Sequence, residues 1–466
     1  MQVSPSRPHV PTADLEALVK GRVIGPEDPD YDAARAVMPG GIDRRPAAIV
    51  RVAGAPDVAA LVRFATDRGL PLSVRSGGHS AVGHGVVDDG IVIDLRDMKA
   101  LEFDVEGRTA WAETGLTAGE YTKAAAAHGL ATGFGDTGTV GIGGITLGGG
   151  VGYLVRKYGL TIDALLAAEV VTADGQIRHV DADHDPDLFW AIRGGGGNFG
   201  VATRFRFRLF DVSSFVGGML LLPATPETVF GFMEAAAAAP DELSAIANVM
   251  PAMPMPFVPE EHHGKLAIMA LMAWSGDVEA GQRALAPFRA VATPIADMVQ
   301  PMPYPQIYGP EAEAGADEYH PTAVSRTLFV DRVDRDMAAL IVDRLNASDA
   351  SIRVAQLRVL GGASARVPIE ATAYAHRLAP IMVNVAAFID GPDDGPRRHA
   401  WVNEFAGALD RDGHGAYVNF LGDEGADRVR AAYPGTTWDR LAEIKARYDP
   451  TNLFRSNQNI APASAG

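Results

Sequence analysis

The stretch PLSVRSGGHSAVGHGVVDDGIVIDL, from Pro71 to Leu95, places a glycine turn and a histidine between two apolar runs. The two residues without Cβ, Gly77 and Gly78, can adopt positive φ and bring backbone N–H groups against a ligand. The imidazole of His79, directly after this turn, can be a base, a metal ligand or the anchor of a covalent cofactor. Taken alone, the stretch is also compatible with a plain loop, so its interpretation depends on the rest of the chain.

Two further glycine-rich segments follow: GDTGTVGIGGITLGGGVGYL at 135–154 and RGGGGNFGVAT at 193–203. A disordered linker would also carry serine, proline and charge, whereas apolar residues such as Ile142 and Ile145 interrupt the glycines here. We therefore expect packed backbone in contact with a flat ring and a pyrophosphate. Residues 195–200 match the G-x-G-x-x-G string, but a helix precedes them and a strand follows. This order is the reverse of a Rossmann site, and we reject that reading.

Composition excludes several classes of function. The 466 residues contain no cysteine, so disulfides, thiolate catalysis and cysteine-based metal sites are ruled out. A net charge of −17 without a basic run argues against nucleic-acid partners and anionic membrane surfaces. The alternating aspartates at 181–187 resemble the start of a calcium loop, but Pro186 and Ile192 stand where glycine and glutamate are needed, and we expect no metal. The N-terminal residues lack a signal-peptide pattern, which favours a cytoplasmic protein.

The chain reads as α+β, because strands and helices are mixed without strict βαβα alternation. Within 43–75 the pattern predicts strand, helix and strand, with Asp57 as the cap of the helix and Gly69 as its end. Near 210–223 the composition shifts toward alanine, methionine and proline, and glycines become rarer. The residues from there to about Gly407 are expected to form a sheet flanked by helices that serves as a substrate wall.

The three glycine segments, in this order and spacing, resemble the FAD domain of the vanillyl-alcohol-oxidase superfamily, specifically the berberine-bridge-enzyme-like oxidases. The closing RLAEIKARYDPTNLFRSNQNI, residues 440–460, is similar to that family's final signature. The resemblance implies a PCMH-type FAD-binding domain of two subdomains and a substrate domain with an antiparallel sheet flanked by helices. The expected boundaries are a leader and helix at 1–30, the FAD-binding domain at 31–213, the substrate-binding domain at 214–410, and a segment at 411–466 that returns to the FAD domain.

In the resembling family the histidine after the Gly-Gly turn carries the flavin through its 8α-methyl carbon, which implies covalent attachment through His79. Many relatives add a cysteinyl link at the position of Thr137; without cysteine, the attachment here can only be single. Val140 falls where the family sets the access of dioxygen, with valine typical of oxidases and leucine of dehydrogenases. The other interpretation of Val140 is a plain strand residue.

The segment Tyr417-Val418-Asn419-Phe420 carries the mechanistic information. Relatives that oxidise alcohols or sugars typically end this motif with a tyrosine base, assisted by a carboxylate that maps here to Asn384. Since phenylalanine and asparagine accept no proton, the usual base pair is absent. The pattern resembles the 6-hydroxy-D-nicotine-oxidase branch, where an asparagine at the position of Asn419 lies near the ring. Tyr417 is either a base or an aromatic that packs against flavin.

We therefore expect FAD bound through His79, and the oxidation of an amine or alcohol carbon of a small, apolar or heterocyclic substrate, with dioxygen as acceptor and hydrogen peroxide as product. The alternative is a flavin-containing cyclase, and a third reading is a scaffold without FAD. The expected catalytic residues are Tyr417, Asn419, Asn384 and Val140. The expected cofactor-binding residues are Val74, Arg75, Ser76, Gly77, Gly78, His79, Ser80, Gly83, His84, Thr137, Gly138, Thr139, Val140, Gly143, Gly144, Leu147, Gly148, Gly150, Gly200, Val201, Tyr417, Asn419 and Asn457. The sequence does not indicate an oligomeric state.

Overall fold

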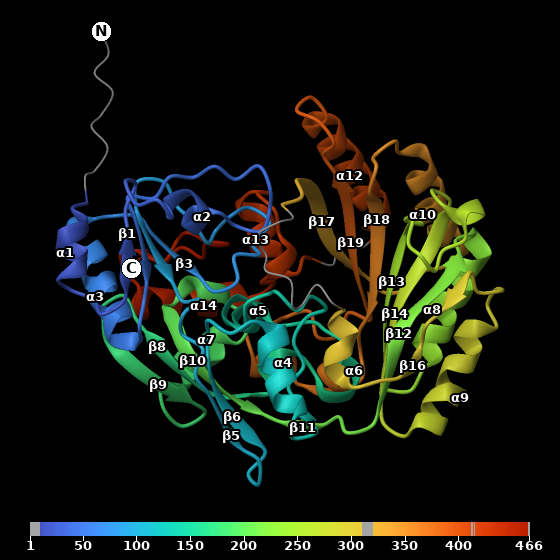
Figure 1. The fold of residues 1–466 in the computed structure, drawn as a ribbon, viewed down its shortest axis with the longest axis horizontal. Coiled ribbons are helices and arrows are strands. Elements are labelled where there is room, and N and C mark those ends of the chain that lie inside the picture. Colours follow the sequence, from blue (N-terminus) through green and yellow to red (C-terminus); the bar gives the residue numbers. More distant parts are fainter. Residues whose placement is uncertain (1–9, 310–319, 412, 414, 465–466) are drawn as a thin grey trace.

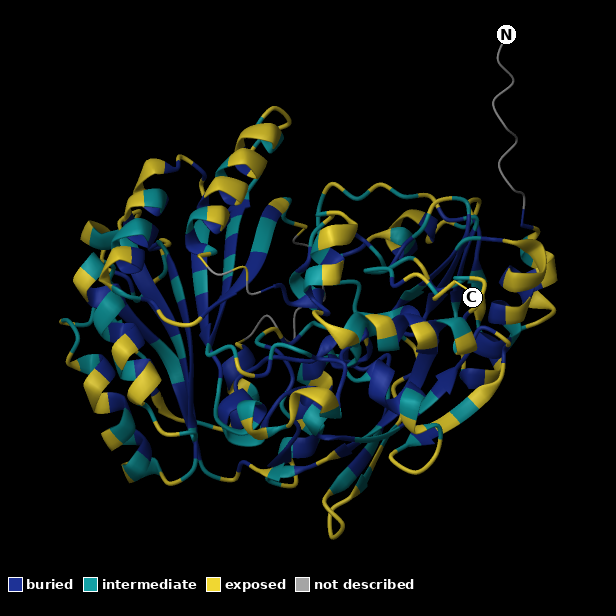
Figure 2. Ribbon diagram, turned by 180° about the vertical axis from the view of Figure 1, so that it is seen from behind, coloured by how far each residue is buried: buried dark blue, intermediate teal, exposed yellow. Residues whose placement is uncertain are grey.

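The computed structural model describes residues 10–309, 320–411, 413 and 415–464. The chain forms an α+β fold in which two smaller sheets lie on one side and a large antiparallel sheet on the other (Figure 1). Strands are mostly buried, while the outward faces of the helices are exposed (Figure 2). Among the described residues, no helix combines the length and the apolar character needed to cross a membrane.

The first sheet has four strands in the order β1-β2-β4-β3, with β2, β4 and β3 parallel. Its elements are α1 (Thr12–Glu16), β1 (Arg22–Ile24), α2 (Tyr31–Arg35), β2 (Ala48–Arg51), α3 (Ala55–Arg68), β3 (Leu72–Arg75) and β4 (Ile91–Asp94). Helix α3 ends as predicted at Gly69, which adopts φ +62°. The predicted cap was wrong: Asp57 lies inside α3, and its carboxylate instead accepts the backbone N–H groups of Lys20, Gly21 and Ala53.

The second sheet is antiparallel in the order β5-β6-β10-β8-β9. Its elements are β5 (Leu101–Asp104), β6 (Thr109–Glu113), α4 (Ala118–Ala126), α5 (Ile142–Gly148), α6 (Val155–Tyr158), β8 (Leu165–Val171), β9 (Ile177–Asp181), α7 (Pro186–Ile192) and β10 (Val201–Arg208). The short strands β7 (Leu130–Ala131) and β11 (Phe210–Asp211) pair with each other beside it.

The large sheet is wholly antiparallel in the order β15-β12-β14-β13-β18-β19-β17, with β16 also paired to β12. Its strands are β12 (Phe215–Pro223), β13 (Leu243–Pro251), β14 (Leu266–Ser275), β15 (Ala296–Asp297), β16 (Gln300–Pro301), β17 (Ala323–Val330), β18 (Arg353–Val359) and β19 (Ile381–Phe388). Its outer face packs against α8 (Pro226–Ala238), α9 (Val278–Arg289), α10 (Arg335–Ala347) and α12 (Gly395–Leu409). The short α11 (Ala363–Arg366) lies against α6.

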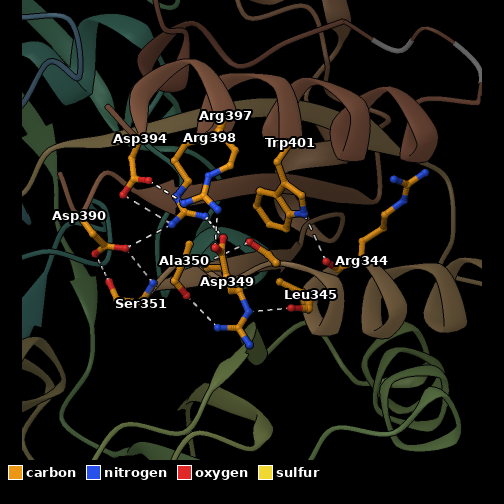
Figure 3. A network of polar contacts seen from close by, with 12 residues as sticks. Arg344, Leu345, Asp349, Ala350, Ser351, Asp390, Asp394, Arg397, Arg398 and Trp401 are labelled. Carbon is orange, nitrogen blue, oxygen red and sulfur yellow. Dashed lines mark hydrogen bonds and ion pairs between the residues drawn. The ribbon is translucent and has the colours of Figure 1, made fainter. Parts of the chain in front are cut away.

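Helix α12 is fastened to the end of α10 by a network of arginines and aspartates (Figure 3). The buried guanidinium of Arg398 donates to Asp349 at 2.5 Å and lies 3.7 Å from Asp394, while Arg397 also pairs with Asp349. Trp401 Nε1 donates to the backbone carbonyl of Arg344 at 3.3 Å. The network holds α12 over the sheet at a point remote from the cavity described below.

The chain then returns to the first two sheets through α13 (Ala426–Ala431) and α14 (Thr436–Tyr448) (Figure 1). The fully buried ammonium of Lys445 donates to Asp449, to the carbonyl of Asn198 and to the carbonyl of Phe454, at 2.7 to 2.9 Å. The bonds to Asn198 and Phe454 join α14 to the third glycine segment and to the loop that follows α14, which we call the final loop.

Candidate active site

A cavity of about 550 Å³ lies between the glycine-rich segments and the inner face of the large sheet. Six parts of the chain meet there: the turn after β3, the segment around α5, the loop before β10, the strands β17, β18 and β19, the motif at 417–421, and the final loop. The lining residues that carry the argument are Ser76, Gly77, Gly78, His79, His84, Asp136, Val140, Gly144, Gly196, Gly197, Ser325, Gln356, Arg358, Asn384, Tyr417, Asn419, Phe420 and Asn457.

The turn after β3 is fixed from behind by Arg75. Its buried guanidinium donates to the Asp94 carboxylate at 2.7 Å and to the carbonyl of Ala36 at 3.0 Å, so its charge is paired within the protein. A Cβ on Gly77 would lie 2.2 Å from the backbone nitrogen of Gly141, and Gly78 adopts φ +74°. Both glycines are therefore required by the backbone itself.

Two neutral histidines follow that turn. Burial lowers the pKa of His79 to about 4, against the opposing influence of a hydrogen bond to the backbone of Thr139, and its Nε2 is buried without a hydrogen-bond partner. Burial also lowers the pKa of His84 to about 4, with a further contribution from the positive charge of Arg44. Near neutral pH both rings are uncharged, and each keeps a nitrogen lone pair.

The glycines around α5 fall into two groups. A Cβ on Gly148 would lie 2.0 Å from Asn419 Oδ1, and one on Gly150 would lie 2.0 Å from Thr161 Oγ1, so these positions are closed by the protein itself. A Cβ on Gly144 or Gly197, in contrast, would have no atom within 4 Å, and both residues line the cavity. The sequence interpretation assigned all the glycines of this segment to ligand contact, whereas Gly148 makes room for Asn419 and Gly150 for Thr161.

Tyr417 and Asn419 form one hydrogen-bonded unit on the floor of the cavity. The backbone N–H of Gly150 and the Asn419 side-chain amide both donate to Tyr417 Oη at 2.9 Å, and the same amide donates to the carbonyl of Ile145 at 3.1 Å. Burial raises the pKa of Tyr417, and the two donated bonds oppose that shift. Near neutral pH the side chain is a phenol whose oxygen accepts two hydrogen bonds, which leaves its own O–H to donate.

The opposite wall consists of side chains from the large sheet and holds one ion pair. Arg358, 3% exposed, donates to Asp136 at 2.6 Å, and its guanidinium carbon lies 4.9 Å from the centroid of the Phe420 ring. Its Nε donates to Gln356 Oε1 at 2.8 Å. Asn384 lines the same wall from β19, and its Oδ1 is buried without a partner. We call Ser325, Gln356, Arg358 and Asn384 the sheet wall. The glycine wall consists of the lining residues Ser76, Gly77, Gly78, His79, Gly141, Gly143, Gly144, Ile145, Leu147, Gly196 and Gly197.

The structure brings most of the predicted site residues together. Val140, Asn384, Tyr417 and Asn419 all line the cavity, as does the greater part of the predicted cofactor set. Five predicted residues stand behind the lining: Gly83, Gly138, Thr139, Gly148 and Gly150.

The sequence interpretation missed other lining residues, among them Asp136, Gly196, Gly197, Ser325, Gln356, Arg358, Phe454, Ser456 and Gln458. A signal for two of them was present. Gln356 and Arg358 alternate with Ala355, Leu357 and Val359 along a predicted strand, which is typical of a strand with one polar face.

Two protein families match separate parts of the chain. The FAD binding domain family matches residues 46–181, and the berberine and berberine-like family matches residues 416–461. (R)-6-Hydroxynicotine oxidase of Paenarthrobacter nicotinovorans is 30% identical over 95% of this chain and 97% of its own length. Xylooligosaccharide oxidase of Thermothelomyces thermophilus is 28% identical over 90% of this chain and 88% of its own. The crystal structure of 6-hydroxy-D-nicotine oxidase from Arthrobacter nicotinovorans superposes with a TM-score of 0.85 at 29% identity, covering 96% of this chain and 98% of that one.

Proposed function

This chain belongs to the berberine-bridge-enzyme-like FAD-linked oxidoreductases, and from that premise we propose that it oxidises the amine carbon of a small substrate. The chemistry that FAD supplies when bound is the acceptance of a hydride equivalent at its N5 and the return of both electrons to dioxygen, which leaves as hydrogen peroxide. The residues of this chain supply the binding, the orientation and the electrostatic environment for that chemistry.

The cavity fits FAD on the evidence of its own atoms. Gly144 and Gly197 present bare backbone to open space, which suits close approach of a flat ring or a diphosphate. Those open glycines, the turn at Ser76–Gly78 and the final loop with Asn457 all face one continuous space. The residues that would hold the cofactor are therefore the glycine wall, His79 and the final loop.

We assign covalent attachment to His79. A neutral ring has the lone pair that bond formation requires, and the unpartnered Nε2 supports the assignment because the protein itself does not use it. With no cysteine in the sequence, the attachment is single. Val140, on the cavity lining before α5, is assigned to the control of dioxygen access.

The observation that carries the choice of amine over alcohol is the environment of Tyr417. Burial raises its pKa although Tyr417 Oη accepts hydrogen bonds from Gly150 N and Asn419 Nδ2, so Tyr417 is a phenol near neutral pH and not a ready base. An alcohol must lose its O–H proton as hydride leaves, whereas the nitrogen lone pair of a neutral amine stabilises the developing cation without a base. Alcohol oxidation remains the second candidate, because relatives of this chain act on oligosaccharides.

The first test is the fate of yellow colour on acid precipitation of the purified protein. We expect the colour in the pellet for the wild type and in the supernatant for His79→Ala. Colour in the supernatant for both would contradict the covalent assignment, and a colourless wild type would contradict the whole proposal.

The second test is peroxide release with a panel of neutral secondary amines and of sugar alcohols, using Tyr417→Phe beside the wild type. For an amine substrate this variant should lose less than about tenfold in turnover, since no base is removed, whereas loss of a true base costs about a hundredfold or more. A loss of a hundredfold or more would establish Tyr417 as a base and favour alcohol oxidation. Substrate conversion without peroxide would instead indicate a cyclase.

A further inference from the structure

Three amide side chains stand side by side on the inner face of the large sheet. Asn248 on β13 pairs in register with Gln356 on β18, and Gln356 pairs with Asn384 on β19. Their sequence neighbours, among them Ala247, Leu357 and Val383, belong to the core beneath the outer helices. Since side chains alternate along a strand, the three amides face away from that core. Gln356 and Asn384 line the cavity.

Two of the three amides are committed within the protein. Gln356 Oε1 accepts from Arg358 Nε at 2.8 Å, and Gln356 Nε2 donates to Asn248 Oδ1 at 2.8 Å. Asn248 Nδ2 in turn donates to the carbonyl of Met269 at 3.2 Å. A directed chain of hydrogen bonds therefore runs from the Arg358–Asp136 ion pair to a backbone carbonyl, and it fixes which end of each amide is donor and which is acceptor.

Asn384 takes no part in this series of hydrogen bonds. Its amide makes no hydrogen bond to any residue in the described ranges, and its Oδ1 is buried from water. An amide oxygen left in this state is unfavourable, and native proteins satisfy nearly all such groups. The Asn384 amide is therefore open to a partner that enters the cavity.

The charged groups around the cavity are already neutralised. Among the described lining residues, the Arg75 guanidinium is paired with Asp94 at 2.7 Å, and Arg358 with Asp136 at 2.6 Å. The two histidines, His79 and His84, are neutral near pH 7. An ionic substrate at the sheet wall would thus lose its hydration without meeting an unpaired side-chain counter-ion, which is unfavourable.

Resting on the proposed function, we propose that Asn384 is a specificity-determining residue that selects an electrically neutral substrate carrying a hydrogen-bond donor, an amide N–H or a hydroxyl, directed at the Asn384 amide oxygen. Gln356, clamped by Arg358 and Asn248, holds the neighbouring surface rigid and is a positioning residue. The substrate class is therefore neutral amines that also carry an amide N–H or a hydroxyl group, and carboxylates and ammonium ions are excluded.

The test measures binding to the yellow, flavin-loaded protein rather than turnover. Dissociation constants of benzamide, N,N-dimethylbenzamide and benzoate are measured by calorimetry and by the change in visible absorption, for the wild type, Asn384→Leu and the control Asn403→Leu. Asn403 lies exposed on α12 and is not part of the cavity lining. Benzamide has the neutral donor, its dimethyl form lacks the donor, and benzoate replaces it with a charge.

For the wild type and Asn403→Leu we expect benzamide to bind at least tenfold more tightly than either other probe. In Asn384→Leu the dissociation constants of benzamide and its dimethyl form should agree to within twofold. Because asparagine and leucine side chains are of similar size, the change in this ratio between wild type and variant reports the lost hydrogen bond. An unchanged ratio in Asn384→Leu, benzoate as tight as benzamide, or no benzamide binding at millimolar concentration would each overturn the inference. A yellow protein that releases no peroxide yet shows the expected ratios would refute the proposed function and support the role of Asn384.

Discussion

The two walls of the cavity are built on opposite principles. The glycine wall is backbone, and at Gly77 even a methyl group would collide with another segment of main chain. The sheet wall is made of side chains on a regular antiparallel ladder, with Gln356 and Asn384 in register. The shape of the glycine wall depends on the path of the backbone, and the chemistry of the sheet wall depends on the side chains that the strands carry.

Under the proposed function, the glycine wall would hold the cofactor and the sheet wall would select the substrate. At the closed positions of the glycine wall, such as Gly77 and Gly141, a side chain requires the backbone of touching segments to move. Changing the sheet wall requires only a new side chain on an unaltered strand. We therefore expect substitutions in the first wall to affect folding and flavin content, and substitutions in the second to affect selectivity at little cost in stability.

The largest effect is expected from Gly77→Ala. Its Cβ would lie 2.2 Å from Gly141 N, and relief requires the turn and the start of α5 to separate. We expect a loss of about 3 kcal/mol or more in the free energy of unfolding and a colourless protein. The matched variant Gly144→Ala, with open space around the new methyl, should keep its stability to within about 1 kcal/mol and lose flavin only. Urea unfolding measures the stability of the two variants, and the ratio of flavin to protein absorbance measures their flavin content. Equal losses of stability in Gly77→Ala and Gly144→Ala would contradict the distinction between closed and open glycines.

The next effect is at the seam where the sheet wall meets the loop before α5. Arg358→Leu leaves the Asp136 carboxylate, 19% exposed, without its cation, and we expect a loss of about 2–4 kcal/mol in the free energy of unfolding. The double variant Asp136→Asn with Arg358→Leu should recover more than half of it, because no unpaired charge remains. A double-mutant cycle in urea measures the coupling, and strict additivity would show that the pair contributes nothing.

A smaller effect is the dependence of stability on pH that the two cavity histidines confer on the flavin-free protein. The pKa of His79 and of His84 is about 4 in the folded chain and near 6.5 when unfolded. Between these values the unfolded state binds more protons, so their contribution is complete above pH 6.5 and is lost as pH falls toward 4. Each histidine adds a slope of up to about 1.4 kcal/mol per pH unit. Unfolding midpoints between pH 7 and 4.5 should depend less on pH in His84→Gln; an identical slope would contradict the origin in His84.

The smallest effect is expected in the sheet wall itself. Asn384→Leu removes an amide that makes no internal hydrogen bond, and the free energy of unfolding should stay within about 0.5 kcal/mol or rise slightly. Gln356→Leu on the adjacent strand is the matched comparison. It leaves Arg358 Nε and Asn248 Oδ1 unpaired and should cost about 1–2 kcal/mol. Thermal unfolding distinguishes the two, and an Asn384 variant as unstable as the Gln356 variant would show that Asn384 is structural.

The parts of the fold that the sequence predicted are those decided locally. The end of α3 at Gly69 follows from a residue that adopts positive φ. Helix α5 was missed, since three of its seven residues are glycine and its stability comes from contacts with Ser76 and Leu116. The role of Asp57 was wrong because its partners lie far back along the chain.

The site shows the same division. His79, Tyr417 and Asn419 belong to short motifs that are visible in one dimension. The amide row depends instead on strand register between residues more than a hundred positions apart, Asn248 and Gln356. The Arg358–Asp136 ion pair likewise joins distant segments. No local pattern specifies such pairings, because they arise from how whole strands align.

The return of the final segment has a consequence for how the protein matures in the cell. The cavity is completed by Phe454, Asn457 and Gln458, and Lys445 locks that loop to the third glycine segment. During synthesis from the N-terminus, the turn with His79 emerges early, but the site around it stays open until these late residues have left the ribosome. We therefore expect an enclosed flavin site only after the whole chain has been made, and a chain truncated before Lys445 to present a histidine turn without an enclosed site.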